Sequence, residues 1–262
     1  MPEPRPWTTR RIMKLAVLLL VPLAGFAWLA DAVGAAREVA RASVCVGKLK
    51  CIAVALLNYH DANGALPPAY STDASGRPLL SWRVLILPYM EYADLYNRFR
   101  PDEPWDGPNN IRLLDEMPPG FACATLQPNV SHSTPGRFTN FLAAAGPGTA
   151  FPGGEPVKLA DIKDGLDETI LVVESDQAEV PWTAPIDLDA SAGGLVGMPT
   201  AARWPTTPHP SGLRVATADG MIPILDPEKL RRELPAVASI AGARRYAWTT
   251  SSRSPDRQGP PR

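Results

Sequence analysis

Histidine and cysteine are scarce in this chain, which has 262 residues and only three of each. The histidines, His60, His132 and His209, form no H-E-x-x-H motif and no close pair, so no local zinc-hydrolase pattern is present. The G-x-S-x-G turn of common serine hydrolases is missing, and no G-K-S or G-K-T follows the glycines of residues 146–154. We therefore predict a protein without catalytic activity and without a cofactor.

The central part of the chain also lacks positive charge. Residues 51–228 carry 10 basic and 22 acidic side chains, a net charge of −12, whereas residues 1–50 carry +5 and residues 229–262 carry +6. Nucleic acids bind chiefly to clusters of Lys and Arg that neutralise their phosphates. An acidic central part therefore argues against nucleic acid as the partner.

Proline, by contrast, is abundant. The chain has 30 prolines, about twice the typical share of about 5%. Proline fixes φ and removes a backbone donor, which limits both long helices and interior strands. Because 45% of the residues are still hydrophobic, we predict an α+β body of short elements, with a small antiparallel sheet and proline-rich loops.

Local patterns predict several elements of this body. The apolar or alternating segments 138–144 and 169–174 indicate strands. Segments 213–217 and 221–225 indicate a hairpin around Asp219-Gly220. The spacing of aromatic residues over 89–99 predicts a short helix, and 227–234 another with proline in its first turn. The polar residues 249–262 predict a disordered tail.

An uncharged apolar run near the N-terminus predicts a membrane span at residues 15–36. It follows a basic segment, 1–14, and its residues 15–30 include six Leu, two Val and one Phe. Together these nine residues contribute about −4 kcal/mol to the free energy of membrane insertion, whereas an Asp at the centre of the membrane costs about +3 kcal/mol. Asp31 lies near the end of the run, where its cost is lower. The positive residues of 1–14 predict a cytoplasmic N-terminus and an extracytoplasmic body.

A cleaved signal peptide explains the same residues. The run has a basic leader, and Ala30-Asp31-Ala32 fits a small-residue cleavage site. Thr9-Arg10-Arg11 resembles part of a twin-arginine signal. Both interpretations export the body, and they differ in whether it stays tethered.

The residues after the run favour the tether. Apolar residues between 33 and 60 recur at helical spacings, and no proline breaks the segment before Asn63-Gly64 and Pro67-Pro68. We therefore predict a single helix over about residues 14–62. Its first part would lie in lipid and its second part, residues 37–62, would pack on the folded body as a stem.

The string AVGAAREVARASVCVGKLKCIAVALLNYHDANGALPPAY, which ends at Tyr70, resembles the start of a bacterial pilin-like family of unknown function. This family is catalogued as domain of unknown function fifteen-fifty-nine and is also labelled a solute-binding family. The resemblance covers roughly residues 30–226. It continues through GRPLLSWRVLILPYMEYADLY, DEPWDGPNN, AAAGPGTAFPG, IKDGLDETILVVE, VPWTAPIDL and TADGMIPIL.

The resemblance carries two further implications. It marks Cys45 and Cys123 as a matching pair, which implies a disulfide between the stem and the body; the alternative is two buried unpaired thiols. Cys51 would then be the odd thiol. The family usually has a prepilin-peptidase site before the long helix, but this chain reads RRIMK there, with Lys14 in place of the acidic residue. An uncleaved anchor fits these residues better than a processed filament subunit.

A few other residues are candidates for a binding site. Trp105 and Trp182 could stack on a carbohydrate, although Pro-Trp pairs more often close loops onto a core. Glu174 ends an apolar strand and Asp219 lies in the hairpin turn, and both are candidates for ligand contact. Glu174 could be a buried functional acid, with a bond to a backbone donor or an arginine as the simpler interpretation. Four closely spaced acids are weak candidates for Ca²⁺, with a solvated turn as the simpler interpretation; they are Asp161, Asp164, Asp167 and Glu168.

These observations lead to one prediction of function and one alternative. The prediction is a single-pass protein of the inner (cytoplasmic) membrane whose envelope-exposed, pilin-like body has a structural or interaction role. Its partners would be the bilayer, through residues 15–36, and envelope proteins or pilin-like subunits. The alternative is an exported or anchored solute- or carbohydrate-binding module. The predicted domains are 1–14, 15–36, 37–62, a body over 63–235, and a short helix with a basic tail over 236–262.

Overall fold

The computed structural model describes residues 9–123, 137–175, 179–190, 195–196, 207, 209 and 211–241. The chain divides into two compact units, Met1–Ser43 and Val44–Arg262. The predicted tail over 249–262 and His132 lie outside the described residues. The predicted α+β class is confirmed, since a long helix accompanies small antiparallel and mixed sheets.

The first element, α1, is one helix over Thr9–Asn63. It confirms the predicted long helix and begins five residues before the expected start. Pro22 lies inside it without ending it. The helix ends where Gly64 takes a positive φ of 78° and its N–H donates to the carbonyl of His60 at 2.7 Å. Glycine is the usual residue at such a helix end because it has no Cβ to oppose a positive φ.

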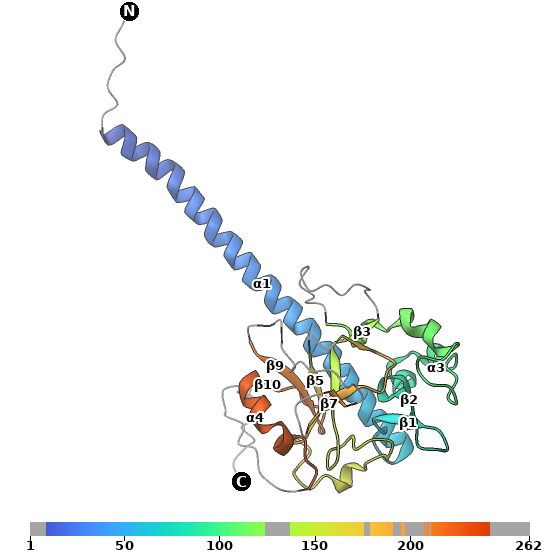
Figure 1. Cartoon of the computed structure of the whole chain (residues 1–262). Coiled ribbons are helices and arrows are strands. Elements are labelled where there is room, and N and C mark those ends of the chain that lie inside the picture. The colour runs from blue at the N-terminus through green and yellow to red at the C-terminus, as the bar shows by residue number, and fades with distance from the viewer. Residues whose placement is uncertain are drawn as a thin grey trace, which may run out of the picture. The chain divides into compact units, whose positions relative to one another are not determined.

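The body contains short helices and strands (Figure 1). The other helices are α2 Trp82–Leu85, η1 Leu87–Met90, α3 Ala93–Tyr96, η2 Asn110–Glu116, η3 Pro119–Phe121, η4 Leu159–Asp161 and α4 Pro227–Val237. The strands are β1 Tyr70–Thr72, β2 Pro78–Ser81, β3 Phe138–Thr139, β4 Phe141–Ala145, β5 Ile170–Glu174, β6 Val180–Pro181, β7 Asp187–Asp189, β8 Leu195–Val196, β9 Leu213–Thr217 and β10 Ile224–Leu225.

The largest sheet in the described part has the strand order β10-β9-β5-β4-β7-β8. Its pairs are antiparallel except for β4 with β7, which run parallel. The predicted hairpin is present as β9 and β10, with a shorter second strand than expected. Two smaller pairs, β1-β2 and β3-β6, accompany this sheet.

The large sheet is buried on both faces. One face packs in a core that includes Phe141 and Ala143 of β4 and the α1 residues Leu49, Ile52 and Leu56. The opposite face packs in a second core; its members include Leu142 and Ala144 of β4 and Leu230, Leu234 and Val237 of α4. Alternate residues of a strand point to opposite faces. The second part of α1 and the amphipathic α4 therefore cover the two sides of the sheet.

The prediction of a single helix over residues 89–99 was wrong. The chain forms η1 and α3 there, separated by Glu91 and Tyr92. Glu91 adopts φ 65°, a left-handed conformation that cannot continue a right-handed helix. The aromatic spacing reflects packing on the core, since Tyr89, Tyr92 and Tyr96 all pack partly buried against it.

Candidate functional site

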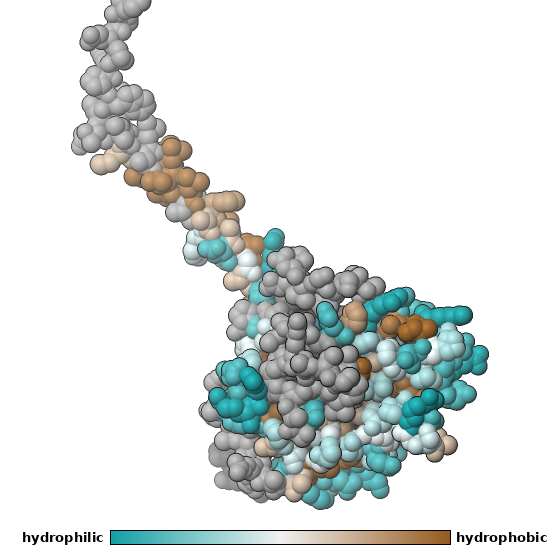
Figure 2. Space-filling view, viewed as in Figure 1, coloured by the Kyte–Doolittle hydropathy of each residue, from teal (hydrophilic) through white to brown (hydrophobic). Residues whose placement is uncertain are grey.

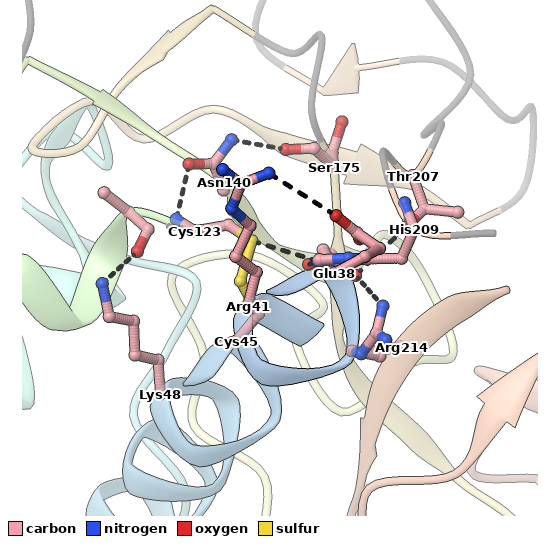
Figure 3. The surroundings of a disulfide bond; sticks show 12 residues. Glu38, Arg41, Cys45, Lys48, Cys123, Asn140, Ser175, Thr207, His209 and Arg214 are labelled. Carbon is pink, nitrogen blue, oxygen red and sulfur yellow. Dashed lines mark hydrogen bonds and ion pairs between the residues drawn. A yellow bond between two sulfur atoms is a disulfide. The ribbon is translucent and has the colours of Figure 1, made fainter. Parts of the chain in front are cut away.

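A disulfide joins the C-terminal half of α1 to the body. It links Cys45 on α1 to Cys123, which lies just after η3 and 78 positions along the chain (Figure 3). These are the two cysteines that the family resemblance pairs. Both are buried, whereas Cys51 is an exposed free thiol on the same helix. The six-residue spacing turns Cys51 away from the face that carries Cys45.

Hydrogen bonds hold the segment around Cys123 from two sides. The Cys123 N–H donates to Oδ1 of Asn140 at 2.8 Å, and Nδ2 of Asn140 donates to the carbonyl of Ser175 at 2.9 Å. Asn140 interrupts the single strand expected over 138–144, which is why β3 and β4 are separate. From the helix, Nζ of Lys48 donates to the carbonyl of Ala122 at 2.8 Å (Figure 3). The position of Cys123 is therefore set by several contacts besides the disulfide.

Three charged or titratable side chains lie beside this disulfide. Nε2 of His209 is 3.4 Å from Sγ of Cys123 and 3.5 Å from Oε1 of Glu174. Nη1 of Arg214 donates to Oε2 of Glu174 at 3.3 Å. The side chains of all three are at most 2% exposed. A buried chain of contacts thus runs from Cys123 through His209 and Glu174 to Arg214.

Neighbouring strands and a tight turn position these groups. Glu174 is the last residue of β5, and Arg214 lies on β9, the strand that pairs with it. Between His209 and Arg214, Gly212 has a φ of 112°, and a Cβ there would stand 2.7 Å from the carbonyl oxygen of Leu225. Glycine alone fits this approach to β10, so Gly212 allows the turn to place His209 next to the sheet.

Glu174 has an unusual environment for a carboxyl group. Burial raises its pKa, while Arg214 and His209 oppose that rise. Its Oε2 accepts from Arg214, and the hydroxyl of Thr207 stands 3.5 Å from it. Its Oε1 is buried and has no hydrogen-bond partner among the described residues. Buried oxygens of this kind are uncommon and call for an explanation.

The ligand atoms of Cys45, Cys123, Glu174 and His209 all lie within 4.8 Å of one another. Thiolate sulfur, imidazole nitrogen and carboxylate oxygen are the donors that zinc takes in proteins. The sequence predicted the cysteine pair, and Glu174 as a general ligand-binding candidate. It did not predict this grouping, because the four residues are spread over positions 45 to 209 and show no short metal-binding spacing.

A second buried charged group lies elsewhere in the body. Nη2 of Arg83 donates to Oδ1 of Asp187 at 2.6 Å, and both side chains are at most 4% exposed. Arg83 also donates to the carbonyl of Phe141, and Asp187 accepts from the indole of Trp82 at 3.2 Å and from the N–H of Ala143 at 2.7 Å. Burial raises the pKa of Asp187, and Arg83 opposes this rise. These contacts join α2, β4 and β7, so this pair has a structural role.

The remaining sequence candidates lie in different surroundings. Trp182 is fully buried, stacks on Phe121 at 5.9 Å between ring centroids, and donates to the carbonyl of Leu114 at 3.0 Å. Trp105 is partly buried against both cores. Asp219 is exposed in the β9–β10 turn, where it accepts from the hydroxyl of Thr217 at 2.6 Å and the N–H of Met221 at 3.0 Å.

The four acids proposed as weak calcium candidates lie around η4 and in the loop before β5. Asp161 and Asp167 are exposed, and Asp164 and Glu168 are partly exposed. Within the described ranges, they do not form a group of convergent ligand atoms like the one beside the disulfide.

No curated protein and no solved structure is recognisably similar to the chain. A family model described as "Protein of unknown function (DUF1559)" matches residues 34–244. This range contains the described body, the disulfide and the cluster beside it. The chain therefore belongs to the DUF1559 family.

Proposed function

We propose that this DUF1559 protein is a single-pass membrane protein whose pilin-like body has a structural or interaction role outside the cytoplasm, without catalysis. The observation that carries the proposal is the apolar N-terminal part of α1. This part is long and apolar enough to cross a membrane, and none of its most apolar stretch is buried among the described residues. The large apolar side chains that the structure describes between Val17 and Val33, which include Leu20 and Phe26, are 41–73% exposed.

So many exposed apolar side chains on one helix are unfavourable in water, because apolar surface is more stable in a non-aqueous environment. Figure 2 shows brown, hydrophobic atoms along this part of the helix and mainly teal or pale atoms on the visible face of the body. A helix needs about 20 predominantly apolar residues to cross a bilayer, and residues 15–36 meet that length. The continuous helix from this run into the body is also what a pilin-like subunit requires.

The disulfide supports placement of the body outside the cytoplasm. Disulfides persist in oxidising compartments and are rare in the cytosol of most organisms. The basic residues of 1–14 favour a cytoplasmic N-terminus by the positive-inside rule. The indole of Trp182, one of the residues expected to stack on a carbohydrate, is buried in the core, which disfavours solute binding by stacking on this residue.

Membrane attachment can be tested by charge in the apolar run. The double variant Leu20→Arg/Phe26→Arg raises the free energy of membrane insertion by about 5–7 kcal/mol. This cost exceeds the favourable contribution of the apolar residues, which is about 4 kcal/mol. We expect it to leave the membrane pellet, while the parent chain resists extraction by high salt. Val39→Arg is the matched control: it replaces an exposed apolar residue of the same helix beyond the span. Equal pelleting of the double variant and the control would contradict the proposal.

The exposed thiol of Cys51 reports on the side of the membrane where the body lies. Cys45 and Cys123 are bonded to each other, so Cys51 is the reactive cysteine of the oxidised chain. We expect a membrane-impermeant maleimide to label it in intact spheroplasts, and the Cys51→Ser variant to remain unlabelled. Labelling that requires lysis of the spheroplasts would place the body in the cytoplasm and overturn this topology.

A further inference from the structure

The disulfide and the groups beside it raise a question that membrane attachment does not answer. A structural disulfide needs no ligands around it, yet a histidine nitrogen and a carboxylate oxygen lie within 4.8 Å of both cysteine sulfurs and of each other, and all four residues are buried. The carboxylate oxygen, Oε1 of Glu174, has no hydrogen-bond partner within the described part of the chain. The Nε2 atom of His209 lies 3.5 Å from this oxygen without forming a hydrogen bond to it. Burying an oxygen without a hydrogen bond is costly, which favours a second state in which a ligand satisfies it.

We propose that Cys45, Cys123, His209 and Glu174 form a tetrahedral zinc(II) site when the disulfide is reduced, so that the disulfide and the metal are alternative occupants of one position. Zinc bonds of about 2.0–2.3 Å place the ligand atoms of a tetrahedral site about 3.3–3.8 Å apart. Two distances lie in this range: Nε2 of His209 is 3.4 Å from Sγ of Cys123 and 3.5 Å from Oε1 of Glu174. The two sulfurs are bonded to each other and have to separate before a metal can bind, and all four ligand atoms lie within 4.8 Å of one another.

The charges around the site also suit a dication. Two thiolates and one carboxylate carry −3, and zinc reduces this to −1. Arg214 contacts Glu174 through Oε2, on the opposite side of the carboxylate from His209, and its guanidinium neutralises the remaining charge. Oε1 is left to bind the metal. Partners that fix a ligand in this way are typical of zinc sites, and the two sulfurs favour zinc over magnesium or calcium.

The two states are related by a two-electron step. A dithiol reductant transfers two electrons and two protons to the Cys45–Cys123 bond, giving two thiols, and becomes a disulfide itself. Zinc then displaces both thiol protons as it binds. Sulfur atoms bonded to each other offer no thiolate, so metal and disulfide exclude each other. Because all four residues are buried, the metal would enter as the reduced chain folds or opens locally.

The proposal is tested by zinc binding to the full-length chain in detergent. The background variant Cys51→Ser removes the third thiol. The disulfide is reduced with a phosphine. Water supplies the oxygen of the phosphine oxide that forms, and the disulfide becomes two thiols. We expect one zinc per reduced chain and none per oxidised chain, measured by competition with a chromogenic chelator. Cobalt(II) in place of zinc should give thiolate-to-cobalt charge-transfer absorption and visible bands of tetrahedral geometry.

Ligand variants separate this site from simple thiol binding. Loss of a residue that only supports a metal ligand usually weakens metal binding 10–100-fold. His209 and Glu174 are proposed as ligands themselves, so we expect His209→Ala and Glu174→Gln to weaken zinc binding by at least this factor. His60→Ala is the control: this histidine lies on α1, outside the four-residue group, and should leave the affinity unchanged. Zinc binding that is equal in His209→Ala and the parent would overturn the proposal, and so would a reduced chain that folds but binds no zinc.

Folding is monitored by circular dichroism in the same samples. If the reduced chain loses structure without metal, we expect zinc to restore it in the parent but not in His209→Ala, since metal binding then supplies folding energy. Failure of zinc to restore the parent would leave the disulfide as a purely structural bond and overturn the proposal. Because fractionation plays no part in these measurements, their failure would not affect the proposed membrane attachment.

Discussion

Replacing Cys123 with alanine is expected to lower the free energy of unfolding by about 4 kcal/mol. The Cys45–Cys123 bond closes a loop of 78 positions, and the chain-entropy model gives about 4.5 kcal/mol for a loop of this length. For a domain of this size, that loss corresponds to a fall of about 8–16 °C in Tm. Urea denaturation in detergent, followed by tryptophan fluorescence with a metal chelator present, measures the change.

Two variants define the contribution of the bond itself. Cys51→Ser alters an exposed thiol and should change stability by no more than about 0.5 kcal/mol. Cys45→Ala/Cys123→Ala removes both sulfurs and should match Cys123→Ala closely, because the bond is absent from each. If Cys123→Ala unfolded at the same urea concentration as Cys51→Ser, the disulfide would not be an important constraint on the native body.

Removing Arg83 should destabilise the body by a similar amount, about 3–5 kcal/mol for Arg83→Met. Asp187 would keep its hydrogen bonds from Trp82 and Ala143 but would lose its counter-charge while still buried. The carbonyl of Phe141 would lose two donor groups as well. The change is measured by the same urea titration, at a pH where Asp187 is ionised.

A solvent-exposed pair provides the matched control. Arg98 contacts Glu116 with side chains 53% and 43% exposed, and pairs of this kind contribute about 0–1 kcal/mol. Arg98→Met should therefore have little effect. Arg83→Met/Asp187→Leu, which removes both buried charges, should recover part of the loss. Equal effects of Arg83→Met and Arg98→Met would show that burial does not amplify the Arg83–Asp187 interaction.

Much of the fold could be predicted because the relevant signals are local. An uncharged apolar run and helical spacing over consecutive turns predicted α1, and Asn63-Gly64 marked its end. Alternating or apolar segments bounded by turn residues predicted β5 and β9, and a proline in the first turn of the segment 227–234 predicted α4. The prediction of a helix over residues 89–99 also used a local spacing pattern, and there it was wrong. The aromatic spacing of this segment is a packing pattern, and periodicity does not distinguish that from a continuous helix.

The sequence by itself determined the apolar helix, the α+β class and, through its resemblance to a family, the pairing of Cys45 with Cys123. Only the tertiary structure brought Glu174 and His209 to that disulfide and paired Arg83 with Asp187. The partners in these contacts are 35 to 104 positions apart, and no spacing rule connects residues so distant in the chain. Their proximity depends on which strands pair and in which register, and the packing of the whole body decides that.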